Sequence, residues 1–250
     1  MPTINASKYG ILGNSSINSF SQCRNSSTAN DFTSNQPTSS NAISVRMRYV
    51  SGGKGSEWQL YRAFFAFDVT SYQTGYTISN LRLRLDPTAT SSSNFPIAIV
   101  KSTAQGNADT NLSSSDFGDV DFSTLYGGSS TTYWPDTNSI SDITLNSTAI
   151  SAFSTGYLKL AVMWYDDYNN QAPLLVQTLN GYQNFSYVPR LEFTATATGY
   201  SNNVIGVDGD DIDNIISVDA IELNGRFFFC KNVCQPIIPK PKARPFLACL

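Results

Sequence analysis

The stretch WQLYRAFFAFD, residues 58–68, decides the fold of this chain. It is an apolar and aromatic run that carries charge only at Arg62 and at its last residue, Asp68. Aromatic residues favour strands, and a run of this length and composition is typical of a strand with a neighbour on each side. We therefore predict that it lies at the centre of a sheet.

Strand patterns continue on both sides of this run. Residues 44–50 and 78–85 alternate apolar and polar side chains with a period of two, which predicts half-buried strands. Further strands are predicted in residues 95–101, 140–145, 157–165, 174–176 and 187–196. Short strands separated by Gly, Asn, Ser and Asp clusters indicate an all-β fold, so we predict an antiparallel β-sandwich or jelly roll in residues 1–198.

Three segments of this predicted sandwich show weaker patterns. We expect short strands and loops in residues 1–42 and a long polar excursion in residues 105–137. Residues 146–153 fit one short helical turn. No longer segment shows a helical period, so helices are expected to contribute little to the fold.

The composition excludes several classes of partner and chemistry. Only 14% of the 250 residues are charged and the net charge is −3, so no nucleic-acid partner is expected. No apolar run is long enough to insert into a membrane. Residues 1–5, MPTIN, do not resemble a signal peptide, so we expect either a signal removed beforehand or release by another route, such as lysis. The chain has no histidine, which removes the commonest general base and metal ligand.

Residues 199–225 contain an internal repeat. Residues 202–212, NNVIGVDGDDI, align with residues 213–223, DNIISVDAIEL, at a spacing of eleven. Each unit is too short to bury its own apolar face, so the repeat must pack on the sandwich, on the other copy or on a partner. The candidate attachment positions within it are Ile205, Val207, Ile216 and Val218.

The tail, residues 226–250, is basic and rich in proline, which predicts an extended segment. Phe227, Phe228 and Phe229 would be a liability there unless a partner covered them. We therefore interpret the repeat and the tail as an attachment device for other subunits, with a homotrimer as the expected oligomer by analogy.

Two stretches resemble a known family. Residues 61–70, YRAFFAFDVT, followed by residues 78–85, ISNLRLRL, are similar to the signature of DNRLRE-type jelly-roll domains, and residues 188–194, VPRLEFT, resemble that family's closing strand. The chain departs from the pattern at Asn80, where the family prefers a small residue. The repeat is similar to those that follow such domains in bacteriophage tail and head-fibre proteins. The resemblance implies a surface-displayed sandwich like a carbohydrate-binding module, without a fixed set of binding residues.

Aromatic and acidic residues at two places are candidates for glycan binding. One set lies at the end of a predicted strand: Trp164, Tyr165, Asp166, Asp167 and Tyr168. The other, Tyr133 and Trp134, lies in the predicted polar excursion. Aromatic faces suit sugar stacking and carboxylates bind hydroxyls. The alternatives are core aromatics followed by a loop-capping Asp in the first set, and a hydrophobic plug in the second.

Catalysis and metal binding are weaker interpretations. Asp166 and Asp167 are adjacent, whereas glycoside hydrolysis needs two carboxyl groups that converge on one bond, so we predict no enzyme activity. Asp208, Asp210, Asp211 and Asp213 suit calcium, although a solvated turn inside the repeat is the preferred interpretation; no other cofactor is expected.

Two arginines and four cysteines complete the candidates. Arg62 and Arg190 lie among apolar neighbours, and we expect acids such as Asp68 or Glu192 to pair with them. Cys230 and Cys234 form only a weak zinc pattern, so disulfides or free thiols are expected for them, for Cys23 and for Cys249.

These observations predict a structural protein of a bacteriophage virion, such as a capsid decoration protein or a tail or head fibre. It would lie on the virion surface, contact other virion proteins and bind host-surface glycans. The alternatives are a glycan-binding module of a bacterial surface or secreted protein and, with least support, a polysaccharide depolymerase.

Overall fold

A computed structural model describes residues 1–17, 19–35, 43–52, 55–85, 87–90, 96–133, 141–172, 179–185 and 188–198. All of them belong to one compact unit, Met1–Thr198. The repeat and the tail lie outside the described residues, so the attachment positions in residues 205–229 and the calcium candidates in residues 208–213 stay predictions.

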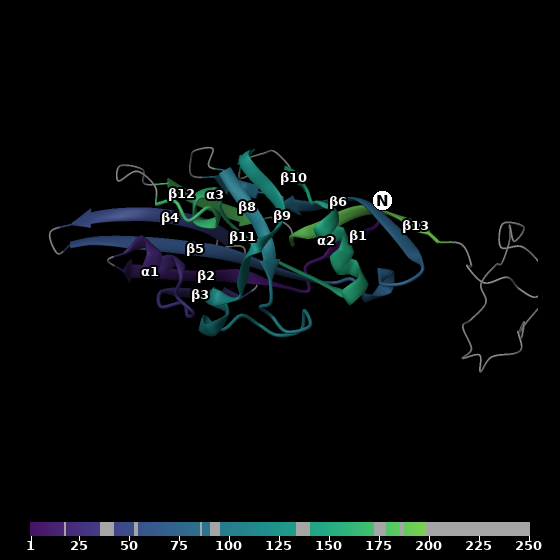
Figure 1. Cartoon of the computed structure of the whole chain (residues 1–250), viewed down its shortest axis with the longest axis horizontal. Helices are drawn as coiled ribbons and strands as arrows, with labels where there is room; N and C mark the ends of the chain where they lie inside the picture. The colour runs from purple at the N-terminus through teal and green to yellow at the C-terminus, as the bar shows by residue number, and fades with distance from the viewer. Residues whose placement is uncertain are drawn as a thin grey trace, which may run out of the picture. The chain divides into compact units, whose positions relative to one another are not determined.

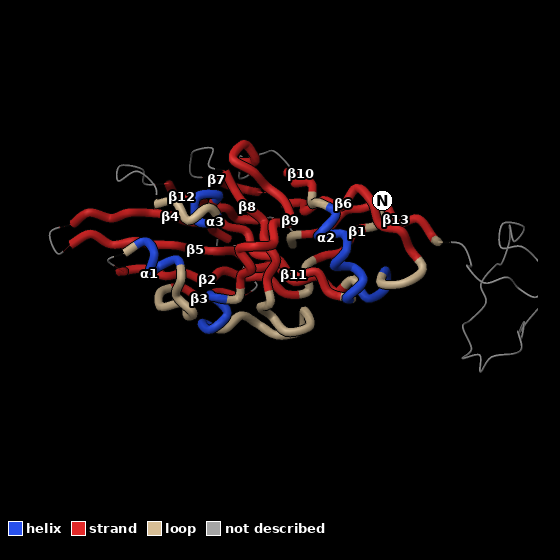
Figure 2. The backbone as a smooth tube through the Cα atoms, in the orientation of Figure 1, coloured by secondary structure: helices blue, strands red, loops and turns tan. Residues whose placement is uncertain are grey.

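The described unit is an all-β sandwich of two antiparallel sheets, as the sequence predicts (Figures 1 and 2). The four-stranded sheet contains β1 (Thr3–Asn5), β6 (Tyr76–Leu85), β10 (Ser141–Thr144) and β13 (Arg190–Ala197). The nine-stranded sheet contains β2 (Lys8–Ile17), β3 (Phe32–Asn35), β4 (Ile43–Gly52), β5 (Gly55–Asp68), β7 (Pro87–Thr90), β8 (Pro96–Ser102), β9 (Val120–Tyr133), β11 (Tyr157–Trp164) and β12 (Leu179–Phe185).

Helical segments are short and lie between strands. The α-helices are α1 (Phe20–Arg24), α2 (Ser147–Ser151) and α3 (Tyr165–Tyr168), and the 3-10 turns are η1 (Thr70–Tyr72), η2 (Ser114–Gly118) and η3 (Ala152–Thr155). The helical turn predicted in residues 146–153 is confirmed by α2 and η3. Asn146 begins α2, because its side chain accepts a hydrogen bond from the backbone N–H of Ala149.

β5 is the central strand, which confirms the prediction for residues 58–68. It pairs with β2 along one side, and with β4 and then β11 along the other. Phe64, Phe65 and Phe67 are completely buried because both faces of this strand are covered. The strand therefore carries Arg62 into the interior as well, where the guanidinium must find partners.

The smaller sheet covers the core with one face only. Leu81, Leu83 and Leu85 of β6 are buried, whereas Arg82 and Arg84 between them lie on the outer face. The same alternation places Leu191 and Phe193 of β13 inside. This period of two confirms the sequence prediction for both strands.

The two sheets meet at Gly127 and Gly128. Gly127 forms a bridge with Leu145, next to β10, while Gly128 pairs with Ala98 of β8. A Cβ atom on Gly128 would lie 2.3 Å from the carbonyl oxygen of Ile97, and its φ of +86° also favours glycine. Only this pair of glycines lets β9 approach both neighbours so closely.

Two sequence predictions for this unit were wrong. Residues 105–137 contain a strand, β9, which the pattern hides because its pairing with β8 shifts register at several points. Residues 1–42 contain more than short strands, since β2 runs from Lys8 to Ile17 along the central strand. The strand predicted in residues 174–176 lies outside the described residues.

Candidate functional site

The larger sheet brings the ends of β9 and β11, where the two sets of candidate glycan-binding residues begin, to the same side. β9 and β11 both pair antiparallel with β8, so these two strands run in the same direction and end at the same side of the sheet. Tyr133, at the end of β9, pairs with Pro96, and Trp164, at the end of β11, pairs with the next residue, Ile97. Since neighbouring strands lie about 4.8 Å apart, the two strand ends are separated by roughly 10 Å. Trp134 lies outside the described residues.

Helix α3 turns the chain back directly after β11. The backbone N–H of Asn169 donates to the carbonyl oxygen of Tyr165, and that of Gln171 donates to the carbonyl oxygen of Asp166. The rings of Tyr165 and Tyr168 lie 5.7 Å apart between centroids, tilted by 42°. Both tyrosines are half-buried, so each ring has an apolar side against the protein and an accessible side.

Asp166 lies between these two tyrosines in the chain and is also half-buried. Among the described residues, no hydrogen bond or ion pair reaches its carboxylate. Burial raises the pKa of Asp166 above its ordinary value, and no cation of the described unit offsets that effect. An ionised carboxylate at this position destabilises the fold, and no contact within the described unit compensates for that loss.

Two of the predicted glycan-binding residues are not accessible. Trp164 and Asp167 are each 2% exposed, because the last residue of β11 faces the core and α3 turns Asp167 inward. The interpretation of these two side chains as glycan contacts is therefore wrong for the folded unit described here. The accessible candidates of this set are Tyr165, Asp166 and Tyr168, which define what we call the α3 platform.

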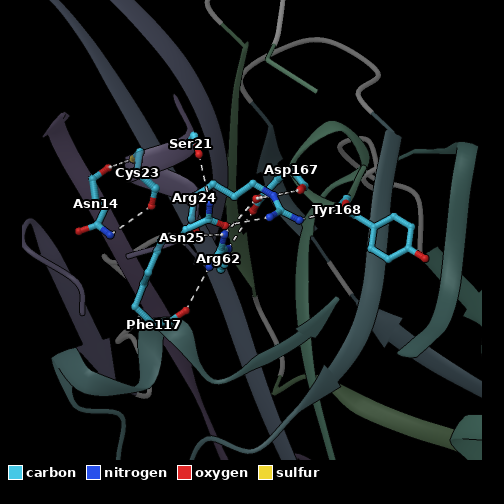
Figure 3. Close-up of polar contacts among 9 residues, drawn as sticks. All are labelled: Asn14, Ser21, Cys23, Arg24, Asn25, Arg62, Phe117, Asp167 and Tyr168. Atoms are coloured by element: carbon cyan, nitrogen blue, oxygen red, sulfur yellow. Dashed lines mark hydrogen bonds and ion pairs between the residues drawn. The ribbon is translucent and has the colours of Figure 1, made fainter. Parts of the chain in front are cut away.

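Asp167 forms a buried ion pair with Arg62 of the central strand (Figure 3). Nε of Arg62 donates to Oδ2 of Asp167 at 2.8 Å and Nη2 donates to Oδ1 at 2.9 Å, which is the two-pronged geometry that arginine and carboxylate favour. Arg62 also donates to the carbonyl oxygens of Phe117 and Arg24. The prediction that an acid pairs with Arg62 is confirmed, but the acid is Asp167 and not Asp68.

Arg24, at the end of α1, binds the same turn through its backbone. Nε of Arg24 donates to the carbonyl oxygen of Asp167 at 2.7 Å, and Nη2 donates to that of Tyr168 at 3.2 Å. Its guanidinium stacks on the ring of Phe122, 3.8 Å from the centroid. Figure 3 shows the ring of Tyr168 pointing away from this cluster while its carbonyl group faces it. We call Arg24, Arg62 and Asp167 the buried arginine cluster.

Sequence reasoning missed Arg24 entirely. It lies 143 positions from the carbonyl group that it binds, in a segment expected to hold only short strands and loops. The available signal was its isolation, since no other arginine or lysine lies between Lys8 and Arg46. An isolated arginine is only a weak indication of a buried side chain, because most arginines are exposed.

Cys23 lies next to this cluster and is a buried free thiol. Burial raises the pKa of Cys23 to about 12, although the charge of Arg62 opposes the rise. The thiol therefore stays protonated at neutral pH and behaves as a small apolar side chain. Of the two states left open by the sequence, a disulfide or a free thiol, Cys23 has the second, and the other three cysteines lie outside the described residues.

A second group of charges covers the outer face of the smaller sheet. Arg190 of β13 donates to Glu192 at 3.2 Å, which confirms the pairing predicted for it. Glu192 also accepts from Arg84 at 3.0 Å, and Asp142 of β10 lies near both Arg84 and Arg82. We call these five residues the outer charge network.

Within the described residues, no group of acidic or cysteine side chains has the arrangement of a metal site. No described helix is long and apolar enough to cross a membrane. Comparison with known proteins finds no family model that matches the chain and no curated protein that matches it.

Proposed function

We propose that this chain is a non-enzymatic structural protein of a bacteriophage particle, and that its β-sandwich recognises a host-surface glycan at the α3 platform. The observation that carries the recognition step is the pair of half-buried tyrosine rings of α3, Tyr165 and Tyr168, beside a half-buried carboxylate without a partner in the described residues. Ring faces stack on the C–H surfaces of sugars, and a carboxylate accepts hydrogen bonds from their hydroxyl groups.

The placement of the chain's exit supports a display role. Thr198, the last described residue, donates its backbone N–H to the carbonyl oxygen of Gly75, beside the end of β13. In Figure 1 this end of β13 lies away from α3, within the described unit. The described unit therefore ends at a distance from the α3 platform, which is compatible with a platform that stays accessible on the particle.

The environment of the two adjacent acids supports binding over hydrolysis. Asp167 is held in the interior by Arg62, so only Asp166 of the pair reaches the surface. A glycosidase of the usual kind needs a second carboxyl group on the other side of the scissile bond. Within the described residues, the α3 platform offers a single carboxyl group, that of Asp166, which suits recognition of a sugar and not its cleavage.

The glycan proposal is tested with the full chain on an array of bacterial surface oligosaccharides: O-chain, capsular and peptidoglycan fragments. We expect binding that the double substitution Tyr165→Ala, Tyr168→Ala abolishes. The matched control is Tyr76→Ala, since Tyr76 is 43% exposed and its ring also pairs with a second tyrosine, Tyr72, at 5.3 Å. Binding that survives the double substitution would show that the α3 platform is not the site.

Asp166→Asn separates recognition from folding. Because burial raises the pKa of Asp166, its favourable contribution exists below the unfolded-state pKa and is lost as the pH rises through the folded-state pKa. At pH 7 the substitution should therefore leave the melting temperature unchanged or raise it, while it weakens glycan binding. A clear fall in melting temperature would mean that the carboxylate stabilises the fold, and the argument for a functional role would fail.

The virion proposal is tested by mass spectrometry of purified particles. We expect the chain among the structural proteins, at a copy number fixed relative to the major capsid protein. Detection in the lysate but not in the particles would favour the alternative of a secreted or surface-bound glycan-binding module.

A further inference from the structure

Arg24 and Arg62 place two cations against one carboxylate in the interior. Arg62 is completely buried and the side chain of Arg24 is 10% exposed, while Asp167 supplies the only acidic group in contact with them among the described residues. Burial lowers the pKa of Arg24, which indicates that its charge is held at a cost. Arg62 alone already satisfies both oxygens of Asp167. Charge balance around Asp167 therefore does not require Arg24.

What Arg24 adds is control of the backbone. It binds two consecutive carbonyl groups, those of Asp167 and Tyr168, with donors from one rigid guanidinium. Two bonds from one planar group therefore fix the orientation of the two peptide units on either side of the Cα of Tyr168. Stacking on Phe122 and a bond from Nη1 to the side chain of Asn25 hold the guanidinium in place.

This backbone carries the α3 platform. The Cα of Tyr168 lies between the two fixed peptide units and Asp166 precedes them in the turn, so a rotation there would change the orientation of the two tyrosine rings. Because Arg62 holds the side chain of Asp167 in the interior, Asp166 and Tyr168 lie on the accessible side of the turn.

We propose that Arg24 is a positioning residue of the glycan site. Its guanidinium bonds the carbonyl groups of Asp167 and Tyr168 from the buried side of the turn, and so fixes the orientation of Tyr168 and Asp166 on the accessible side. The inference rests on the proposed function and adds to it a residue from a distant part of the chain. Binding of a sugar by two rings depends on their mutual orientation, so loss of Arg24 should weaken recognition before it unfolds the sandwich.

The test compares three variants of the full chain. Arg24→Met keeps an apolar stem against Phe122 and removes every donor. Arg24→Lys keeps the cation but cannot span two carbonyl groups in one plane. Arg190→Met is the matched control, because Arg190 is a partly buried arginine of the other sheet, bonded to Glu192.

Two readouts are recorded, both well below the melting temperature. One is calorimetric affinity for the array oligosaccharide that the wild-type chain binds. The other is hydrogen exchange at the backbone amides of Asn169 and Gln171, which close the turn. We expect Arg24→Met to weaken affinity by at least about tenfold and to speed exchange at both amides, with a smaller loss of affinity in Arg24→Lys and none in Arg190→Met.

The outcomes distinguish the two proposals. If the double substitution of Tyr165 and Tyr168 abolishes binding but both Arg24 variants bind as the wild type does, the positioning role is wrong and the site stands. If the tyrosine substitutions have no effect on binding, the site is wrong and the role of Arg24 in it falls with it. If Arg24→Met does not fold, Arg24→Lys decides, because wild-type affinity in that variant would overturn the positioning role.

Discussion

The buried arginine cluster and the outer charge network use the same chemistry in opposite surroundings. In the first, Arg62 and Asp167 are 0% and 2% exposed and every bond replaces one to water. In the second, exposure ranges from 17% for Glu192 to 43% for Arg82, so water screens each pair. The difference teaches that geometry alone does not set the contribution of an ion pair to this fold. Burial decides what is lost when one partner is removed.

The largest effect is expected from Asp167→Ala. The substitution leaves Arg62 buried without its anion, and breaking a buried pair in this way costs about 3–5 kcal/mol. Chemical denaturation would measure the change in the free energy of unfolding. The control is Asp166→Ala at the adjacent position, which should cost far less, and equal losses at both positions would contradict the comparison.

A double substitution tests whether the charges themselves are needed. Arg62→Met with Asp167→Leu removes both ions, and we expect it to be more stable than Asp167→Ala alone. It should remain about 1–3 kcal/mol below the wild type, since the carbonyl oxygens of Phe117 and Arg24 lose their donor. A double variant no more stable than the single one would show that the unpaired cation is not the cause of the loss.

Glu192→Gln should have a smaller effect. Glu192 lies between Arg84 and Arg190, whose backbones are directly opposite in the register of β6 and β13, so its charge relieves their repulsion. We expect a loss of about 1 kcal/mol at low salt that shrinks at high salt. A loss that does not change with ionic strength would contradict a screened network.

Arg82→Ala should have the smallest effect. Its guanidinium is 43% exposed and only approaches Asp142, at 3.7 Å, so a change of about 0–0.5 kcal/mol is expected. Thermal denaturation of both variants on one plate would rank it against Glu192→Gln. A larger loss than that of Glu192→Gln would invert the order that exposure predicts.

The sequence predicted the parts of the fold that depend on local pattern. Residues 58–68 identified the central strand because a buried strand needs apolar side chains on both faces. Residues 78–85 identified a strand with one wet face because Arg82 and Arg84 alternate with leucines. Both inferences required only the period of the side chains.

Other features depend on contacts between distant segments and could not be read from pattern. Arg62 decides that Asp167, and not the adjacent Asp166, turns inward at α3, and it lies 105 positions away in the chain. β9 escaped detection because Gly127 and Gly128 break its alternation where the two sheets meet. The sequence placed the candidates in residues 164–168 together at a strand end, but it did not divide them into accessible and buried members.

The pairing of β1 with β13 has a consequence for biosynthesis. Ile4 lies opposite Leu191, and the backbone N–H of Ala6 donates to the carbonyl oxygen of Pro189. β1 is therefore synthesised long before its partner β13, and its edge and the edge of β6 stay open in the meantime. A nascent chain released before Arg190 would keep both edges unpaired and be prone to aggregate. Only chains in which β13 has been synthesised can close the smaller sheet.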